Sequence, residues 1–239
     1  MFTIEIAGLR IGINNKYSWV ERSCKEYIVQ AEPQFSVCVS QQEIDREMEI
    51  SSHLYSRAYC ESVCIYREIC KQLPQYNAFL LHAAVVEYNG EAYAFVAPSG
   101  TGKSTHAALW CKYFEGNARI INGDKPIVRF LEDGRAWIYG TPWCGKEGYN
   151  INTSAPLKAI CFIQRGTNNY IEPFSGSEMV GRLMKQILMP QDVENIIRTT
   201  NLLDRCVGSV PCYLLTCNMD VSAAKVAYEG MQIKRGNFS

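Results

Sequence analysis

The sequence predicts an α/β fold in which helices cover a sheet of short apolar strands. Three observations carry this prediction. The apolar residues 92–96 run straight into a glycine-rich loop, and residues 105–110 after the loop are helix-forming, with no breaker before Gly116. Further apolar segments and helical patterns then alternate along the chain, as expected for a layered α/β protein.

The first 76 residues differ in pattern from the rest. Alternating apolar residues on either side of Gly8 predict a pair of strands with a tight turn, and residues 35–39 predict another short strand. Residues 59–73 predict a helix that ends before Pro74. We therefore expect residues 1–76 to form a small α+β N-terminal segment and residues 77–239 to form the main domain.

The main domain is predicted to open with a hairpin. Residues 79–86 and 92–96 have strand character, and Asn89-Gly90 between them favours a tight turn. The later strands and helices are predicted in the same way, from the spacing of apolar residues and from helix start and stop signals. We expect strands at residues 119–124, 136–139, 159–163 and 211–217, and helices at 177–189, 192–206 and 221–230.

Composition excludes several classes of function. Lys plus Arg and Asp plus Glu number 24 each, and no run of like charges occurs, so nothing favours binding to nucleic acid or to a membrane surface. No basic start followed by an apolar run, and no stretch near the ~20 apolar residues of a membrane span, is present. We expect a cytoplasmic protein. Its 11 cysteines lack a CxxC pair and are interpreted as reduced, mostly buried thiols; Cys60 and Cys64 with His53 are the weaker alternative of a metal site.

The glycine-rich loop carries the clearest chemistry. It matches the end of the phosphate-loop pattern G-x-x-x-x-G-K-[ST], in which backbone N–H groups cradle phosphates, lysine reaches the outer phosphates and the hydroxyl holds Mg²⁺. Ala97 replaces the opening glycine. We expect bound ATP to contact seven residues, namely Ser99, Gly100, Thr101, Gly102, Lys103, Ser104 and Thr105.

Phosphoryl transfer also requires a carboxylate that holds the metal or orients the nucleophile. Asp124 follows a predicted strand and is the best candidate, although it could instead belong to a plain Asn-Gly-Asp turn. His82 lies in an apolar strand, where it is either a core side chain or a catalytic group. His106, in the helix after the loop, is interpreted as covering the nucleotide site, and His53 as a surface residue.

A second unusual segment is the loop Gly140 to Gly148, with three glycines and one proline. It is either a long connection or part of an acceptor site, because long ordered loops often bind ligands. In the second case Lys146 would face a phosphate and Trp143 or Cys144 would shape the acceptor pocket. Arg165 and Arg182 are candidates for charge stabilisation of the transition state, with surface salt bridges as the alternative.

The segment Ala97 to Thr105 resembles the loop of the HPr kinase/phosphorylase and phosphoenolpyruvate carboxykinase group, which shares an S-G-x-G-K-[ST] core. His82, in Leu81-His82-Ala83-Ala84-Val85, stands at the matching distance before the loop and resembles the HPr kinase catalytic domain more closely. The resemblance covers roughly residues 78–230. It implies a P-loop kinase fold with a mixed sheet, to which residues 1–76 add a small α+β extension.

The chain departs from that family at one position. In the family two adjacent aspartates follow the helix and strand after the loop, one binding Mg²⁺ and one acting as acid and base on the serine. Here Asp124 stands between Gly123 and Lys125. Three interpretations stay open: Asp124 does both jobs, His82 takes the proton, or Lys125 replaces a metal ligand with a fixed charge.

Together these observations predict an ATP- and Mg²⁺-dependent kinase that phosphorylates a hydroxyl, such as a serine of a peptide, a protein or the free amino acid. Lys103, Asp124 and His82 would be catalytic, Ser104 and Asp124 would hold Mg²⁺, and the acceptor would bind near Gly140 to Gly148. The alternatives are an ATP-binding regulatory or assembly protein without a dedicated acceptor, and a carboxykinase-like lyase. A homo-oligomer is left open.

Overall fold

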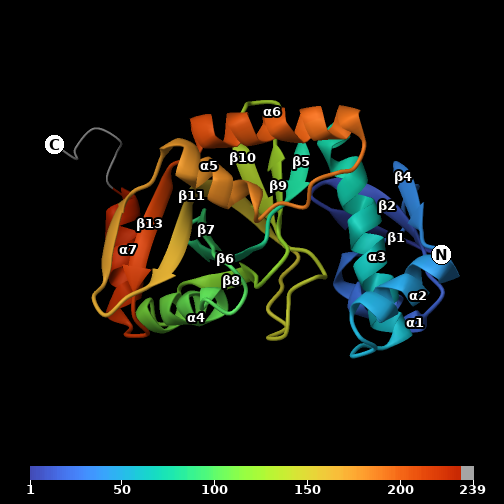
Figure 1. The fold of residues 1–239 in the computed structure, drawn as a ribbon, viewed down its shortest axis with the longest axis horizontal. Helices are drawn as coiled ribbons and strands as arrows, with labels where there is room; N and C mark the ends of the chain where they lie inside the picture. The colour runs from blue at the N-terminus through green and yellow to red at the C-terminus, as the bar shows by residue number, and fades with distance from the viewer. Residues whose placement is uncertain (233–239) are drawn as a thin grey trace.

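The N-terminal part of the chain forms a four-stranded mixed sheet. The computed structural model describes residues 1–232. The strand order is β3-β1-β2-β4, with β2 and β4 parallel and the other pairs antiparallel. The strands are β1 (Phe2–Ile6), β2 (Leu9–Asn14), β3 (Ile28–Val29) and β4 (Phe35–Cys38). This sheet lies at one end of the molecule, beside the first helices (Figure 1).

Helices pack against this small sheet. They are α1 (Ser18–Ser23), α2 (Gln41–Ile50) and α3 (Arg57–Gln72), with 3-10 turns η1 (Lys25–Tyr27) and η2 (Leu73–Tyr76). A capping box between Ser40 and Glu43 fixes the start of α2. The apolar core of this part also includes Ala78, Leu80 and Ile127 from the larger sheet. The two sheets therefore share buried surface; the predicted division between residues 76 and 77 stays a prediction.

The larger sheet has nine strands and is also mixed. Its main order is β5-β9-β10-β11-β7-β6-β8, and β13 pairs with β11 and β12. The strands are β5 (Ala78–Leu80), β6 (Ala83–Tyr88), β7 (Glu91–Val96), β8 (Arg119–Asn122), β9 (Ile127–Phe130), β10 (Ala136–Tyr139), β11 (Ser154–Arg165), β12 (Tyr170–Pro173) and β13 (Cys212–Cys217). The chain thus has the α/β fold predicted from the sequence.

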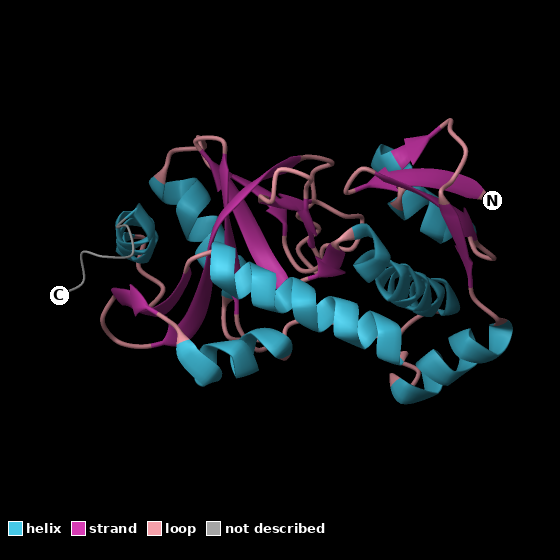
Figure 2. Cartoon of the chain, turned by 90° about the horizontal axis from the view of Figure 1, so that it is seen from above, coloured by secondary structure: helices cyan, strands magenta, loops and turns pink. Residues whose placement is uncertain are grey.

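Helices cover both faces of the larger sheet. On one face lie α5 (Gly176–Met184) and α6 (Val193–Ser209), whose apolar residues join the core of β6, β7 and β11. On the other face lie α4 (Lys103–Tyr113) and α7 (Ser222–Gln232), packed around Tyr93 and Phe95. Seen from above, α6 runs across the molecule from the larger sheet toward the N-terminal helices (Figure 2), where it contacts η2.

The elements that position the site are the three parallel strands β7, β11 and β13. Strand β7 ends at Val96, the glycine-rich loop follows, and α4 starts at Lys103. The order of strand, glycine loop and helix predicted from the sequence is therefore present. The predicted hairpin is present too, with a turn at Asn89 and Gly90, which both have positive φ.

Several elements differ from the expectation. The strand expected at 79–86 is broken at Leu81 and His82, because β5 pairs with β9 whereas β6 pairs with β7 and β8. The strand expected at 159–163 extends over 12 residues, because successive parts of β11 pair with β10 and β13 on one edge. The helix expected at 177–189 ends at Met184. Strands β3, β9 and β12 and helices α1 and α2 were not predicted.

None of the helices within residues 1–232 combines the length and apolar character that crossing a membrane requires. The expected cytoplasmic location stays a prediction.

A glycine next to the site provides a test of packing. A Cβ atom at Gly140 would lie 2.0 Å from the backbone oxygen of Ile151, whereas one at Gly181 in α5 would meet nothing within 4 Å. We expect Gly140→Ala to lower the free energy of unfolding by about 1–3 kcal/mol, and Gly181→Ala to raise it by about 0.4–1 kcal/mol. Urea unfolding of both variants measures this. Equal stability of the two variants would contradict the close approach.

Candidate active site

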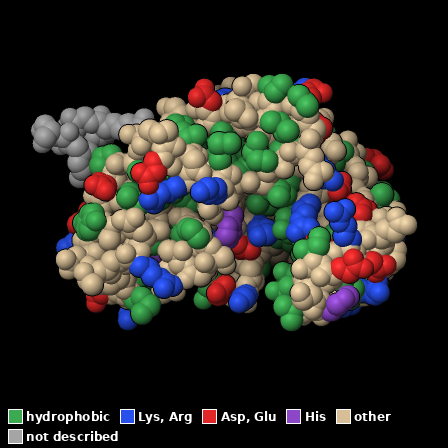
Figure 3. Space-filling model, in the orientation of Figure 1, with side chains coloured by type: hydrophobic (Ala, Val, Ile, Leu, Met, Phe, Trp, Pro, Cys, Tyr) green, Lys and Arg blue, Asp and Glu red, His purple; other side chains and the backbone are tan. Residues whose placement is uncertain are grey.

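A hollow near the middle of the molecule collects the residues that the sequence singled out. Figure 3 shows a histidine, a carboxylate and basic side chains gathered around it. The cleft measures about 360 Å³. Its walls come from the glycine loop with the start of α4, from the segments around His82 and Asp124, and from the loop after β10; the lining residues are His82, Ser99, Gly100, Gly102, Lys103, Ser104, Thr105, Gly123, Asp124, Gly145, Lys146 and Glu147.

The glycine loop leaves the N-terminus of α4 free for an anion. Gly100 and Gly102 have φ angles of 77° and 119°, which L-residues rarely adopt, so glycine is required by conformation at both. Gly102 is the N-cap residue of α4 and offers no side chain to the first N–H groups. Those N–H groups and the helix dipole therefore point toward the cleft without a capping side chain.

Lys103 folds back over the loop. Its side chain is buried, with the residue 7% exposed, and its Nζ donates a 2.9 Å hydrogen bond to the carbonyl oxygen of Ala97. Burial lowers the pKa of Lys103, and the charge of Asp124 opposes that shift. The ammonium is thus held beside the loop by a neutral acceptor, which an anionic ligand would outcompete.

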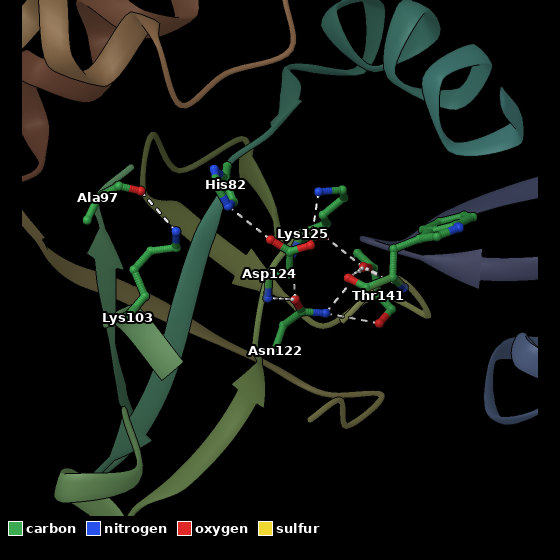
Figure 4. A network of polar contacts seen from close by, with 8 residues as sticks. His82, Ala97, Lys103, Asn122, Asp124, Lys125 and Thr141 are labelled. Atoms are coloured by element: carbon green, nitrogen blue, oxygen red, sulfur yellow. Dashed lines mark hydrogen bonds and ion pairs between the residues drawn. The ribbon is translucent and has the colours of Figure 1, made fainter. Parts of the chain in front are cut away.

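Asp124 lies between two basic side chains (Figure 4). His82 Nε2 is 3.0 Å from its Oδ1, and Lys125 Nζ is 3.0 Å from its Oδ2. Burial of the carboxyl acts to raise its pKa, but the hydrogen bonds and charges of His82 and Lys125 outweigh burial and lower it to about 2. The carboxylate is therefore ionised at neutral pH.

Asn122 builds the turn that holds Asp124 in place. This side chain is fully buried, and its Oδ1 accepts the backbone N–H groups of Asp124 at 2.9 Å and Lys125 at 2.7 Å. Its Nδ2 donates to the carbonyl and hydroxyl oxygens of Thr141 at 3.0 and 3.2 Å. The Asn-Gly-Asp turn considered from the sequence is thus present, and it aims the Asp124 carboxylate at His82.

The loop from Gly140 to Gly148 closes against Asp124. A Cβ atom at Gly145 would lie 3.2 Å from Cβ of Asp124, and Lys146 and Glu147 line the cleft. Trp143 turns away from the cleft, and its Nε1 donates a 3.0 Å hydrogen bond to Ser62 Oγ on α3. Cys144 is partly buried and does not line the cleft.

Helix α3 of the N-terminal segment also reaches the site. Lys125 Nζ lies 5.4 Å from the ring centroid of Tyr66, a cation–π distance, and the Tyr66 and Trp143 rings are 5.9 Å apart. The side chains at 59, 62 and 66 share one helix face. Sequence patterns assigned no role to the N-terminal segment, because Lys125 and Trp143, which α3 contacts, are distant from it in the sequence.

The two candidate arginines have other contacts. Arg165 at the end of β11 donates to the carbonyl oxygens of Gly100 at 2.6 Å and Thr101 at 3.3 Å. It therefore braces the glycine loop. Arg182 pairs with Glu178 at 2.6 Å and stacks on Phe174, away from the cleft.

A second cavity of about 500 Å³ lies on the other side of the glycine loop. It shares Gly100, Gly102 and Thr105 with the cleft, and Thr101 lines this cavity only. His106 stands in its wall and is 2% exposed. Burial lowers the pKa of His106 to about 3, so its imidazole is neutral. His53 is exposed, whereas Cys60 and Cys64 are buried in α3.

Comparisons with known proteins give little beyond this geometry. No family model matches the sequence, and no curated protein does. Among solved structures, the HPr(Ser) kinase/phosphatase from Coxiella burnetii is similar over 64% of this chain and 88% of that chain, with 8% sequence identity and a TM-score of 0.38. At that score the likeness leaves the type of fold undecided.

The Asn122 contacts lead to a prediction. Asn122→Ala removes the partners of several buried polar groups at once, and we expect it to lower the free energy of unfolding by about 2–4 kcal/mol. Asn150→Ala is the control, because Asn150 Nδ2 makes a single, longer contact of 3.4 Å with Thr141. Chemical denaturation compares the two variants. A loss at Asn122 no greater than at Asn150 would show that the turn does not depend on this carboxamide.

Proposed function

We propose that the protein is an ATP- and Mg²⁺-dependent kinase that transfers the terminal phosphoryl group to a hydroxyl, with a serine of a peptide, a protein or the free amino acid as acceptor. One observation carries the proposal: the free N-terminus of α4 and Lys103 face the His82–Asp124 pair across a single cleft. That arrangement combines a phosphate cradle with groups that can handle a proton. Assignment to the HPr kinase type of P-loop fold is part of this proposal.

Phosphate binding would rest on charge and on backbone donors. Lys103 would exchange the Ala97 carbonyl for phosphate oxygens, and a charge-assisted hydrogen bond is stronger than the neutral one it replaces. Lys146 at the opposite wall would add a second positive charge. Arg165 would keep the loop in shape through its contacts with Gly100 and Thr101.

The residues present fit a Mg²⁺ ion that arrives with the nucleotide. The Ser104 hydroxyl and the Asp124 carboxylate line the same cleft and are oxygen ligands of the kind that Mg²⁺ prefers. No cluster of three or more His, Cys, Asp or Glu side chains that could hold a metal occurs within residues 1–232, so phosphate oxygens and water would complete the coordination. The ion would neutralise charge on the migrating phosphoryl group.

The geometry favours His82 as the group that accepts the proton of the acceptor hydroxyl. An Asp124 carboxylate whose pKa is about 2 is a weak proton acceptor, whereas histidine is the side chain that most often serves as a general base. With Nε2 of His82 held by Asp124 at 3.0 Å, its Nδ1 would accept the proton of the acceptor hydroxyl. Asp124 would then orient the imidazole and stabilise its charged form.

The acceptor would enter on the side opposite α4. There the cleft is bounded by Gly145, Lys146 and Glu147. The Trp143–Ser62 hydrogen bond fixes this loop to α3, and the loop runs between the larger sheet and the N-terminal helices (Figure 1). The N-terminal segment would therefore support the acceptor wall.

One observation favours the alternative of an ATP-binding regulatory protein. Lys125 occupies Oδ2 of Asp124, which leaves that oxygen closed to a metal unless the lysine moves. Slow ATP hydrolysis that no serine compound accelerates would support this alternative. A homo-oligomer and the identity of the acceptor stay predictions.

The first prediction concerns Lys103. We expect Lys103→Ala to weaken ATP binding by about 10- to 100-fold and to reduce phosphoryl transfer by at least about 100-fold. Calorimetry with ATP and a non-hydrolysable analogue, with and without Mg²⁺, measures the first effect, and labelled ATP with serine-containing acceptors measures the second. Lys112→Ala, at an exposed position of the same helix, is the control. Normal turnover by folded Lys103→Ala would refute the proposal.

The second prediction separates the two members of the pair. His82→Gln should lower kcat by roughly 10²–10⁴-fold, while Mg²⁺-dependent ATP binding persists. Asp124→Asn should in addition weaken the Mg²⁺ dependence of ATP binding, because it removes a carboxylate ligand. If His82→Gln keeps the wild-type kcat, the proton goes elsewhere.

A further inference from the structure

The second cavity adjoins the cleft at the glycine loop. It lies between α4 and the ends of β11 and β13, and it shares three loop residues with the cleft. It is lined by Gly100, Thr101, Gly102, Thr105, His106, Leu109, Ile163, Arg165, Gly166, Cys217, Asn218 and Met219. A ligand with its phosphates in the glycine loop can therefore extend into this cavity.

The cavity stands at the carboxyl ends of three parallel strands. Strands β7 and β13 flank β11 and run in the same direction. In open α/β sheets, ligands bind in the crevice outside these ends. The ends of β11 and β13 are tied together, because Gly166 donates its N–H to the Cys217 carbonyl at 2.9 Å. Asn218 Nδ2 also donates to the Thr167 carbonyl at 2.9 Å, so the wall is an ordered structure.

His106 lines this cavity and carries a hydrogen-bond donor that the protein itself does not use. Its Nε2 accepts a 3.1 Å hydrogen bond from Trp110 Nε1, so the ring proton is on Nδ1. Within residues 1–232, Nδ1 has no hydrogen-bond partner although it is buried. A buried donor without an acceptor is unfavourable, and such groups call for an explanation such as a bound ligand.

We propose that this cavity binds the nucleoside of the nucleoside triphosphate, and that His106 Nδ1–H donates a hydrogen bond to an acceptor atom of the base or ribose. This inference rests on the proposed function. Leu109, Ile163 and Met219 supply apolar surface for the flat base. The volume of about 500 Å³ lies within the range of small-molecule sites.

Arg165 lines the second cavity and not the cleft. Its guanidinium donates to the Gly100 and Thr101 carbonyls, so its donors are used within the protein. We therefore assign to Arg165 the role of holding the glycine loop in shape. The groups that recognise the nucleoside are His106 and the apolar residues.

The experiment compares ATP with inorganic tripolyphosphate, which has the same phosphate chain and no nucleoside. Calorimetry with Mg²⁺ is done on the wild type, on Leu109→Trp, which fills the cavity, and on Ala108→Trp, which places the same ring at an exposed neighbouring position. We expect wild-type ATP binding to exceed tripolyphosphate binding by about tenfold or more, and Leu109→Trp to abolish that difference while tripolyphosphate still binds. Ala108→Trp should retain it.

The outcomes separate this inference from the proposed function. Equal binding of ATP and tripolyphosphate by the wild type would overturn the nucleoside site and leave the phosphate site standing. Binding of neither by the wild type would refute the proposed function itself. An undiminished preference for ATP in Leu109→Trp would also overturn the inference, because the base would then lie elsewhere.

A second variant tests the donor and does not depend on Leu109→Trp folding. His106→Leu removes the imidazole and keeps Trp110, whose Nε1 donates to Nε2 in the wild type and so places the ring proton on Nδ1. We expect ATP binding to fall by about tenfold and tripolyphosphate binding to stay the same. An ATP affinity of His106→Leu equal to that of the wild type would exclude His106 as a nucleoside ligand.

Discussion

The carboxamide of Asn122 is the interaction on which the cleft depends. One fully buried side chain joins the end of β8, the turn that carries Asp124 and Lys125, and Thr141 at the start of the opposite loop. Thr141 Oγ1 donates in turn to the Lys125 carbonyl at 2.7 Å. Because each polar group has a partner, the turn can stay buried without cost from unpaired donors or acceptors. The orientation of the Asp124 carboxylate follows from this frame.

Charge in the cleft is arranged around that carboxylate. His82 and Lys125 contact its two oxygens. The charge of Asp124 also acts on Lys103, where it opposes the lowering of the lysine pKa by burial. The same basic groups that stabilise the carboxylate also make the surroundings favourable for a polyanion. Asp124, His82 and Lys125 are thus paired with one another. Lys103 and Lys125 are the side chains free to change partners, whereas the His82–Asp124 contact can persist.

Local sequence patterns correctly predicted the structural features that depend on residues close together in the chain. The Asn89-Gly90 hairpin, the strand entering the glycine loop and the start of α4 follow from turn chemistry and apolar periodicity, and the structure has them. The sequence also singled out His82, Lys103 and Asp124, which the fold brings to one cleft. Asn122 and the support from α3 were missed, because their partners, Thr141 and Trp143, are distant in sequence. The break of the strand at His82 likewise depends on pairing with β9 and β8.

The order of the parallel strands has a consequence for biogenesis. The glycine loop follows β7, but the neighbours that complete its surroundings, β11, β13 and α7, come later in the chain, from Ser154 onward. During synthesis the loop therefore emerges from the ribosome long before the strands that flank it. Pairing between such distant segments is slow to form, and domains mature as units once their final strands are available. The surroundings of the glycine loop are thus complete only in the finished chain.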